Sequence, residues 1–224
     1  MTITKNTQQK DIFLASEADA WFERNQAAIG KRNFTEDTVV QVITEIAKLP
    51  QYAETKVKIL EVGCGEARRL EWLADNLNVD VFGIEPSAKA VEQACIRGVQ
   101  AQRGTADNLP FDNASFDVVI FGFCLYLCDR QDLFRIASEA DRVLKSDAWI
   151  VINDFFAPEP IKREYHHKLG VYSYKMDYRT LFDWHPAYTC YSHKLSHHGV
   201  NEFTDDPQEW VATSVMRKKL NLDE

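Results

Sequence analysis

Apolar residues recur at helical spacing in the first fifty positions of the chain. One stripe lies within residues 11–26, and a second, rich in valine and isoleucine, lies within residues 35–49. Side chains three and four positions apart share one face of a helix, so the stripes predict two N-terminal helices within residues 1–50. Pro50 ends the second helix, because proline lacks the backbone N–H that a helix interior requires.

Beyond Pro50 the pattern changes to short apolar runs that alternate with helical stripes. The runs predict strands at residues 57–63, 79–86, 99–106, 116–127 and 148–156. The stripes predict helices at residues 66–77, 87–98 and 131–145. Such alternation indicates βαβ units and a mainly parallel sheet, and the uninterrupted apolar run at 116–127 is typical of a central strand buried on both faces.

The pattern of apolar and polar residues differs in the C-terminal third of the chain. Two strand-like stretches, 187–198 and 209–219, flank a polar break and predict an antiparallel hairpin at one edge of the sheet. We therefore expect an α/β fold, a three-layer sandwich around a mainly parallel seven-stranded sheet, formed by residues 1–224 as a single domain. Residues 157–186 follow the carboxyl end of the fifth strand, where open α/β sheets bind ligands, and are rich in Tyr and His. They are predicted to be an active-site lid.

Composition narrows the function classes. The net charge of −8 argues against a broad nucleic-acid surface, which needs clustered Lys and Arg. The five cysteines contain no C-x-x-C pair, so neither a disulfide framework nor a zinc site is expected. His193 and His197 have the spacing of metal ligands but no Cys or carboxylate partner, so we expect no metal. The sequence has no apolar leader and no apolar run of about 18 residues, from which we expect a cytoplasmic protein without a membrane segment.

The stretch ILEVGCGEA at residues 59–67 joins a strand, a glycine turn and a helix start, which together form a cradle for a nucleotide-like ligand. A dinucleotide prefers a third small residue at the position that Arg68 occupies. Glu61 and Glu66 would also place negative charge beside a pyrophosphate. S-Adenosylmethionine (SAM) carries a sulfonium and an ammonium group and no phosphate, so the acids favour it. An NAD-dependent oxidoreductase is the alternative interpretation.

Four segments in order resemble the motifs of class I SAM-dependent methyltransferases. They are ILEVGCGEA, VFGIEPSAKAVEQA, RGTADNLPFDNASFDVVIFGFCLYL and IASEADRVLKSDAWIVINDF. The resemblance covers roughly residues 12–156 and implies SAM as cofactor. It also implies O- or N-methyl transfer by in-line displacement to a small or medium polar acceptor. A non-catalytic partner subunit on the same fold is a further alternative.

The resemblance also implies a set of cofactor-binding positions at the ends of the predicted strands. They are Glu61, Gly63, Cys64, Gly65, Glu85, Pro86, Ala106, Asp107, Phe121 and Gly122. The glycine loop would wrap the methionine part, with Glu61 near its ammonium group, and Glu85 would accept hydrogen bonds from the ribose hydroxyls. Pro86, Ala106 and Asp107 would border the adenine. Thr105 stands where the family usually has Asp, and Tyr126 stands near the place of a common His.

A hydroxyl acceptor would need a general base, whereas a free amine would hardly need one. His166 and His167 lie in the predicted lid, and histidine is a natural base near neutral pH. Asp154, at the carboxyl end of the fifth strand, is the third catalytic candidate.

Overall fold

Seven strands form one sheet in the described part of the chain. The computed structural model describes residues 8–199, 205–206 and 208–219. The strand order is β3-β2-β1-β4-β5-β9-β8. The strands are β1 (Val57–Val62), β2 (Val79–Glu85), β3 (Gln100–Arg103), β4 (Phe116–Gly122), β5 (Leu144–Phe155), β8 (Tyr188–His197) and β9 (Trp210–Lys219). β1 to β5 are parallel, and β9 runs antiparallel between β5 and β8. The predicted mainly parallel sheet with its C-terminal antiparallel hairpin is confirmed.

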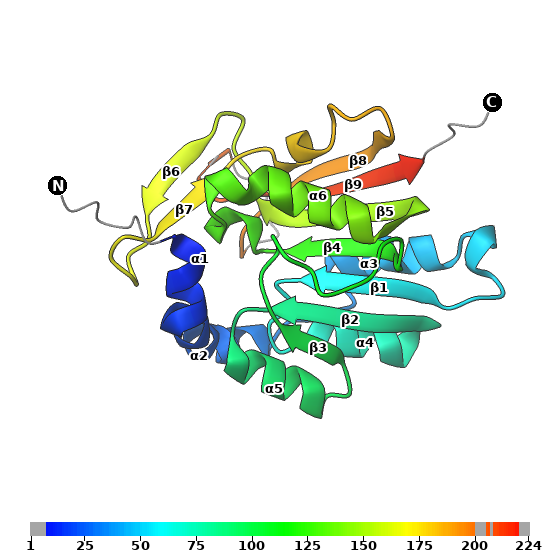
Figure 1. The fold of residues 1–224 in the computed structure, drawn as a ribbon, viewed down its shortest axis with the longest axis horizontal. Coiled ribbons are helices and arrows are strands. Elements are labelled where there is room, and N and C mark those ends of the chain that lie inside the picture. The colour runs from blue at the N-terminus through cyan, green and yellow to red at the C-terminus, as the bar shows by residue number, and fades with distance from the viewer. Residues whose placement is uncertain (1–7, 200–204, 207, 220–224) are drawn as a thin grey trace.

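Helices cover both faces of this sheet (Figure 1). They are α3 (Thr38–Ala47), α4 (Arg68–Asn76), α5 (Ala88–Ile96) and α6 (Leu133–Val143). Successive side chains of a strand point to opposite faces, and β4 shows the consequence. Val118 and Ile120 pack in the cluster that contains α3 and α4 residues, whereas Val119 and Phe121 pack in the cluster that contains α6 residues. The two clusters on either side of the sheet make the predicted three layers.

The N-terminal helices lie beside the carboxyl ends of the parallel strands (Figure 1). The segment predicted as one helix is observed as α1 (Gln9–Ile12), a π-helical turn η1 (Phe13–Glu17) and α2 (Ala18–Ile29). The next helix begins at Thr38 and not at Thr35, because the Asp37 carboxylate caps it by accepting from the backbone N–H groups of Val39 and Val40. Short 3₁₀ turns complete the helical elements: η2 (Pro50–Tyr52), η3 (Leu125–Leu127), η4 (Arg130–Asp132) and η5 (Tyr178–Leu181).

The segment predicted as a lid forms a small antiparallel hairpin, β6 (Ile161–Glu164) with β7 (Tyr172–Lys175), followed by η5. This hairpin packs against the N-terminal helices. The ring centroids of Phe13 and Tyr165 are 6.4 Å apart, and Val171 is buried beside Phe13. The Gln9 side chain donates to the backbone carbonyls of Tyr172 and Leu127. The hairpin therefore braces the N-terminal helices.

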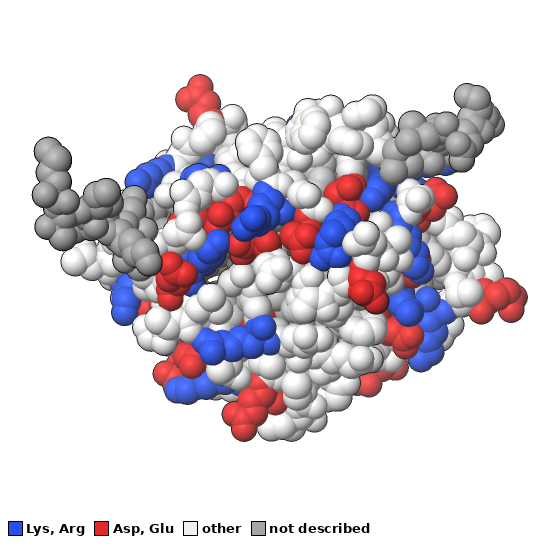
Figure 2. Space-filling view, viewed as in Figure 1, with Lys and Arg blue, Asp and Glu red and all other residues white. Residues whose placement is uncertain are grey.

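Charges are mixed on the surface in view. Figure 2 shows Lys and Arg side chains interspersed with Asp and Glu on this face. Among the described residues, no helix is long and apolar enough to span a bilayer. All five cysteines are free thiols.

Candidate functional site

A cavity of about 410 Å³ opens at the carboxyl ends of the parallel strands. Its floor consists of the ends of β1, β2 and β4 and the loops that follow them. The N-terminal helices form the opposite wall, contributing Lys10, Phe13, Ala18, Trp21, Asn25, Ala28 and Ile29. Nine of the ten predicted cofactor-binding residues line this cavity: Glu61, Gly63, Cys64, Gly65, Glu85, Pro86, Ala106, Asp107 and Gly122. The structure therefore brings together residues from four separate segments.

The glycine loop has the tight backbone that its sequence indicates. Gly63 and Gly65 have φ values of +76° and +55°, a region that favours glycine. A Cβ on Gly63 would lie 2.6 Å from the Cβ of Cys124, so the loop packs directly on the loop after β4. A Cβ on Gly65 would meet nothing within 4 Å. Gly63 is thus required for packing, whereas Gly65 borders open space in the cavity.

Cys64 packs against the neighbouring strand. A Cβ on Gly83 of β2 would lie 2.5 Å from the Cys64 Sγ, which shows that this thiol occupies the notch above that glycine. Burial and the nearby carboxylates of Glu85 and Glu61 raise the pKa of the Cys64 thiol well above its ordinary value. A thiol held protonated is a poor nucleophile, so Cys64 serves as a small apolar filler.

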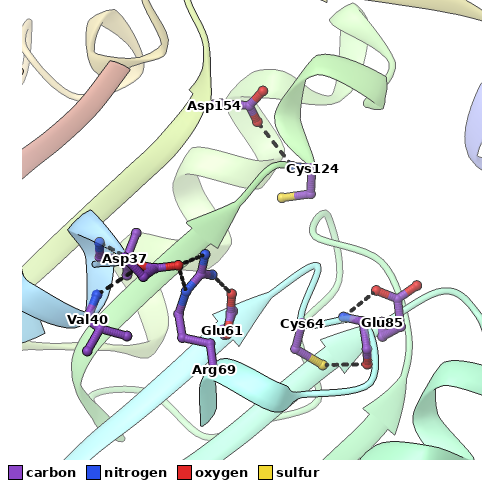
Figure 3. A network of polar contacts seen from close by, with 10 residues as sticks. Asp37, Val40, Glu61, Cys64, Arg69, Glu85, Cys124 and Asp154 are labelled. Atoms are coloured by element: carbon purple, nitrogen blue, oxygen red, sulfur yellow. Dashed lines mark hydrogen bonds and ion pairs between the residues drawn. The ribbon is translucent and has the colours of Figure 1, made fainter. Parts of the chain in front are cut away.

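A buried ion-pair network fixes the acid at the end of β1 (Figure 3). The Arg69 guanidinium pairs with Glu61, and it also donates to Asp37 Oδ2 from Nη2 at 3.1 Å. A Cβ on Gly122 would lie 2.4 Å from Glu61 Oε1, so a larger residue there would displace the pair. Burial raises the pKa of Glu61 against the opposing effect of Arg69. Glu61 lines the cavity, and its Oε2 is buried and accepts no hydrogen bond from any described residue.

Glu85 occupies the end of β2 beside the glycine loop. Its carboxylate accepts hydrogen bonds from the backbone N–H groups of Gly65 and Ser87, both at 2.9 Å. Burial raises the pKa of Glu85 to about 7, although these two hydrogen bonds oppose the rise. The two N–H groups orient the carboxylate at the cavity wall, where it could accept from a diol such as ribose.

Asp107 connects the predicted adenine segment to the N-terminal helices. Lys10 Nζ lies 2.6 Å from Asp107 and 2.8 Å from Asp132. Burial would raise the pKa of Asp107, but hydrogen bonds from Lys10 and Thr105 lower it. The Asp129 carboxylate also accepts from the backbone N–H groups of Gln9 and Lys10. The start of α1 is thereby fixed over this end of the cavity.

Four predicted residues do not line the cavity, although Asp154 lies at the end of β5 as expected. The Phe121 side chain is buried in the core and does not line the cavity, because strand alternation turns it toward α6. His166 and His167 are exposed on the turn between β6 and β7 and do not line the cavity. Asp154 is buried beside the cavity, and its Oδ2 accepts from the backbone N–H groups of Cys124 and Leu125 (Figure 3). It supports the loop after β4.

Aromatic rings that the motifs did not indicate form the other end of the cavity. Phe123, Tyr126, Phe155 and His198 line it, and the Phe155 ring centroid lies 5.0–5.5 Å from those of the other three. Phe123 has a φ of +53°, a strained conformation for a bulky residue, directly after Gly122. In the sequence, Phe123 and Phe155 belong to apolar strands and look like ordinary core residues. Of the four residues, the sequence drew attention only to Tyr126, which stands near the place of a common His in the family.

His198 differs from the other histidines in its position. It follows β8, lines the cavity, and its Nδ1 lies 3.8 Å from Glu209 Oε2. Burial lowers the pKa of His198, with Arg32 and Lys175 adding to the effect and Glu209 opposing it. The side chain is 47% exposed, and the lowered pKa favours the neutral imidazole, which can accept a proton.

Comparisons with known proteins agree with this geometry. Residues 60–152 match the family model described as a methyltransferase domain. The uncharacterized methyltransferase YcgJ of Bacillus subtilis is 28% identical over 116 residues, which are 48% of this chain and 45% of that protein. The 27-O-demethylrifamycin SV methyltransferase of Amycolatopsis mediterranei is 31% identical over 112 residues, 46% of this chain and 40% of that protein. The chain thus matches less than half the length of these curated relatives.

Solved structures extend the similarity over nearly the whole chain. The 1,6-didemethyltoxoflavin-N1-methyltransferase of Burkholderia thailandensis, with 1,6-didemethyltoxoflavin and S-adenosylhomocysteine (SAH) bound, has a TM-score of 0.71 over 94% of this chain and 89% of that chain, at 11% identity. A chain in the complex of the Haloferax volcanii Trm112 methyltransferase activator with a putative methyltransferase has a TM-score of 0.66 over 92% and 97%, at 17% identity. At such identities these structures show the fold alone. Residues 60–152 thus match a methyltransferase domain, and the fold of nearly the whole chain is that of solved methyltransferase structures.

Proposed function

We propose that this protein transfers the methyl group of SAM to a small acceptor that binds at the aromatic end of the cavity. The observation that carries the proposal is the strand order β2-β1-β4-β5, which places the carboxylates of β1 and β2 at one end of the cavity and the aromatic rings that follow β4 and end β5 at the other. Glu61, Glu85 and the Gly63–Gly65 turn form a polar end with carboxylates, which suits a cationic nucleoside. Phe123 and Phe155 belong to the aromatic end, which suits a flat organic acceptor.

The chain's own groups fit the cofactor. The free Oε2 of Glu61 would accept a hydrogen bond from the α-ammonium group. The Glu85 carboxylate, held by two backbone N–H groups, would accept from the ribose hydroxyls. An acid in the position of Glu85 binds ribose in dinucleotide sites too, so it does not distinguish the two cofactors. Glu61, at the end of β1 beside the glycine turn, would repel the pyrophosphate of a dinucleotide, which supports SAM over NAD. When bound, SAM supplies an electrophilic methyl group on a sulfonium.

The protein's main task in this reaction is alignment. An in-line displacement needs the acceptor nucleophile, the methyl carbon and the sulfur on one line, and holding two reactants in that geometry lowers the entropic part of the barrier. The strained Phe123 and the ring of Phe155 give the acceptor a rigid wall. Asp154 fixes the intervening loop by accepting from its backbone. Asp154 therefore acts as a positioning residue.

For a hydroxyl acceptor we propose His198 as the base. Its imidazole lines the cavity, its lowered pKa favours the neutral form, and its Nδ1 lies 3.8 Å from the Glu209 carboxylate. His166 and His167 are exposed on the hairpin turn, so a role for them would require a movement of that hairpin toward the cavity. The geometry supports His198 over both.

The test combines binding with turnover. Isothermal titration calorimetry should detect SAH binding and no NADH binding, and methyl-labelled SAM should then be screened against phenols, hydroxyacids and amines. With a hydroxyl acceptor, His198→Gln should lower kcat by roughly 10²–10⁴-fold, the usual contribution of a general base. The double variant His166→Gln/His167→Gln is the matched control and should keep full turnover. Binding of NADH without SAH would refute the proposal, and SAH binding without any turnover would favour a non-catalytic partner subunit.

A further inference from the structure

Arg32 is a solvent-exposed cation that lines the cavity, and its side chain pairs with none of the described residues. Three arginines line the cavity: Arg32, Arg68 and Arg69. Arg68 pairs with Glu66, and Arg69 pairs with both Glu61 and Asp37. The side chain of Arg32 has no hydrogen bond or ion pair to any described residue. A guanidinium facing a partly enclosed space gains most from a carboxylate, which it can bind through two parallel hydrogen bonds.

The electrostatic interactions of Arg32 show which charged groups lie near it. Loss of surrounding water and the nearby Arg69 lower the pKa of Arg32, while Asp37 and Glu61 oppose the effect. Arg32 in turn contributes to the lowered pKa of His198. Arg32 therefore lies within electrostatic range of both the Glu61 network and the aromatic end of the cavity.

The carboxylate of Glu61 complements the guanidinium of Arg32, because together they could bind a ligand that carries both an ammonium and a carboxylate group. Glu61 lines the cavity, and its buried Oε2 has no hydrogen-bond partner in the described part of the chain. One free carboxylate oxygen and one free guanidinium at the same part of a cavity complement the ammonium and carboxylate of an amino acid. SAM ends in such a group. A carboxylate on an aromatic acceptor is the second ligand group that could bind Arg32. Such an acceptor would contact Phe155 and His198, which line the same cavity.

We propose that Arg32 binds a ligand carboxylate in this cavity, with the α-carboxylate of the SAM methionine moiety favoured by the free oxygen of Glu61. This inference rests on the proposed function. It adds a recognition residue that none of the sequence motifs contains, because Arg32 belongs to the turn after α2 and not to the glycine loop.

The first arm of the test compares SAH with 5′-methylthioadenosine, which has the same nucleoside but no amino-acid group. Calorimetry on Arg32→Gln should show SAH binding weakened by about 10- to 100-fold, the scale of a lost charged hydrogen bond. Binding of 5′-methylthioadenosine should not change, which also shows that the variant is folded. Arg32→Lys should recover part of the SAH affinity. Lys31→Gln is the matched control, since this exposed neighbour does not line the cavity.

The second arm examines the acceptor as the source of the carboxylate. On SAH-loaded protein, 4-hydroxybenzoate and its neutral analogue 4-hydroxybenzamide are titrated into the wild type and Arg32→Gln. Loss of 4-hydroxybenzoate binding alone, with SAH affinity unchanged, assigns Arg32 to the acceptor carboxylate. The proposal is overturned if Arg32→Gln changes neither ligand's affinity, or if it weakens SAH and 5′-methylthioadenosine equally. A wild type that binds neither nucleoside would overturn the proposed function itself and this inference with it.

Discussion

Replacing Glu85 by Gln should remove the pH-dependent cost of burying its charge in the empty protein and should make the cofactor bind more weakly. Burial raises the pKa of Glu85 from its ordinary value of 4.5 to about 7. Below pH 4.5 the carboxyl is protonated in both the folded and the unfolded chain. Above pH 7 it is ionised in both, and the folded chain bears the cost of burying the charge. Stability that this group contributes at low pH is therefore lost as the pH rises through 7.

The magnitude follows from the two pKa values. The interval between 4.5 and about 7 corresponds to about 3 kcal/mol, at ~1.36 kcal/mol per pH unit. Glutamine is uncharged like the protonated form, but its NH2 group cannot accept from one of the backbone N–H groups of Gly65 and Ser87, which costs about 1–3 kcal/mol at every pH. In urea unfolding, the stability of Glu85→Gln relative to the wild type should therefore rise by up to about 3 kcal/mol between pH 4.5 and pH 8. Glu66→Gln is the matched control. Glu66 directly follows the glycine loop and is buried like Glu85, but its ion pairs with Arg68 and Arg97 lower its pKa. Replacing Glu66 should therefore lower the free energy of unfolding at pH 8.

Cofactor binding should change in the opposite direction. If the ionised Glu85 accepts from the ribose hydroxyls, its replacement should weaken SAH binding by about 10- to 100-fold at pH 8. In the wild type the SAH affinity should rise about tenfold from pH 6 to pH 8, because only the ionised form binds well, and in Glu85→Gln this dependence should vanish. Calorimetry over that pH range measures both. A stability difference between Glu85→Gln and the wild type that stays constant from pH 4.5 to pH 8, or pH-independent SAH binding by the wild type, would refute the reasoning.

Two further predictions concern the loop and the buried ion pair. Gly63→Ala should lower the free energy of unfolding by more than about 1 kcal/mol and weaken SAH binding, since its Cβ would lie 2.6 Å from that of Cys124 at a φ of +76°. Cys64→Ala should cost less in both, and equal losses in calorimetry and urea unfolding would contradict the assigned role of the loop. Arg69→Met should lower the free energy of unfolding by about 3–5 kcal/mol, because it leaves Glu61 buried without its counter-charge. Adding Glu61→Gln should restore part of this loss, and an unaltered denaturant midpoint in the single variant would show that the pair contributes nothing.

The sequence by itself determined the sheet and the polar end of the cavity. The strand runs, the glycine turn and the acids at the strand ends are local features, and each occupies a few consecutive residues. Gly63 and Glu85 could be assigned because a βα turn carries its ligand-binding groups at the end of its own strand. The parallel pairing of β1 with β2 then brings the two ends together, as the Gly65–Glu85 hydrogen bond shows.

Only the tertiary structure decided which aromatic, histidine and arginine residues face the cavity. Phe123, Phe155 and His198 come from three segments far apart in the sequence, and their meeting depends on the placement of β9 between β5 and β8 and on the strained turn at Phe123. The histidine-rich segment has the composition of a lid, yet its hairpin packs against the N-terminal helices, which bury Val171. This contact leaves His166 exposed at the turn. A periodic pattern records that a residue is apolar or polar. It does not record which long-range contact covers that residue, and the long-range contacts determine whether it belongs to the core, the surface or the site.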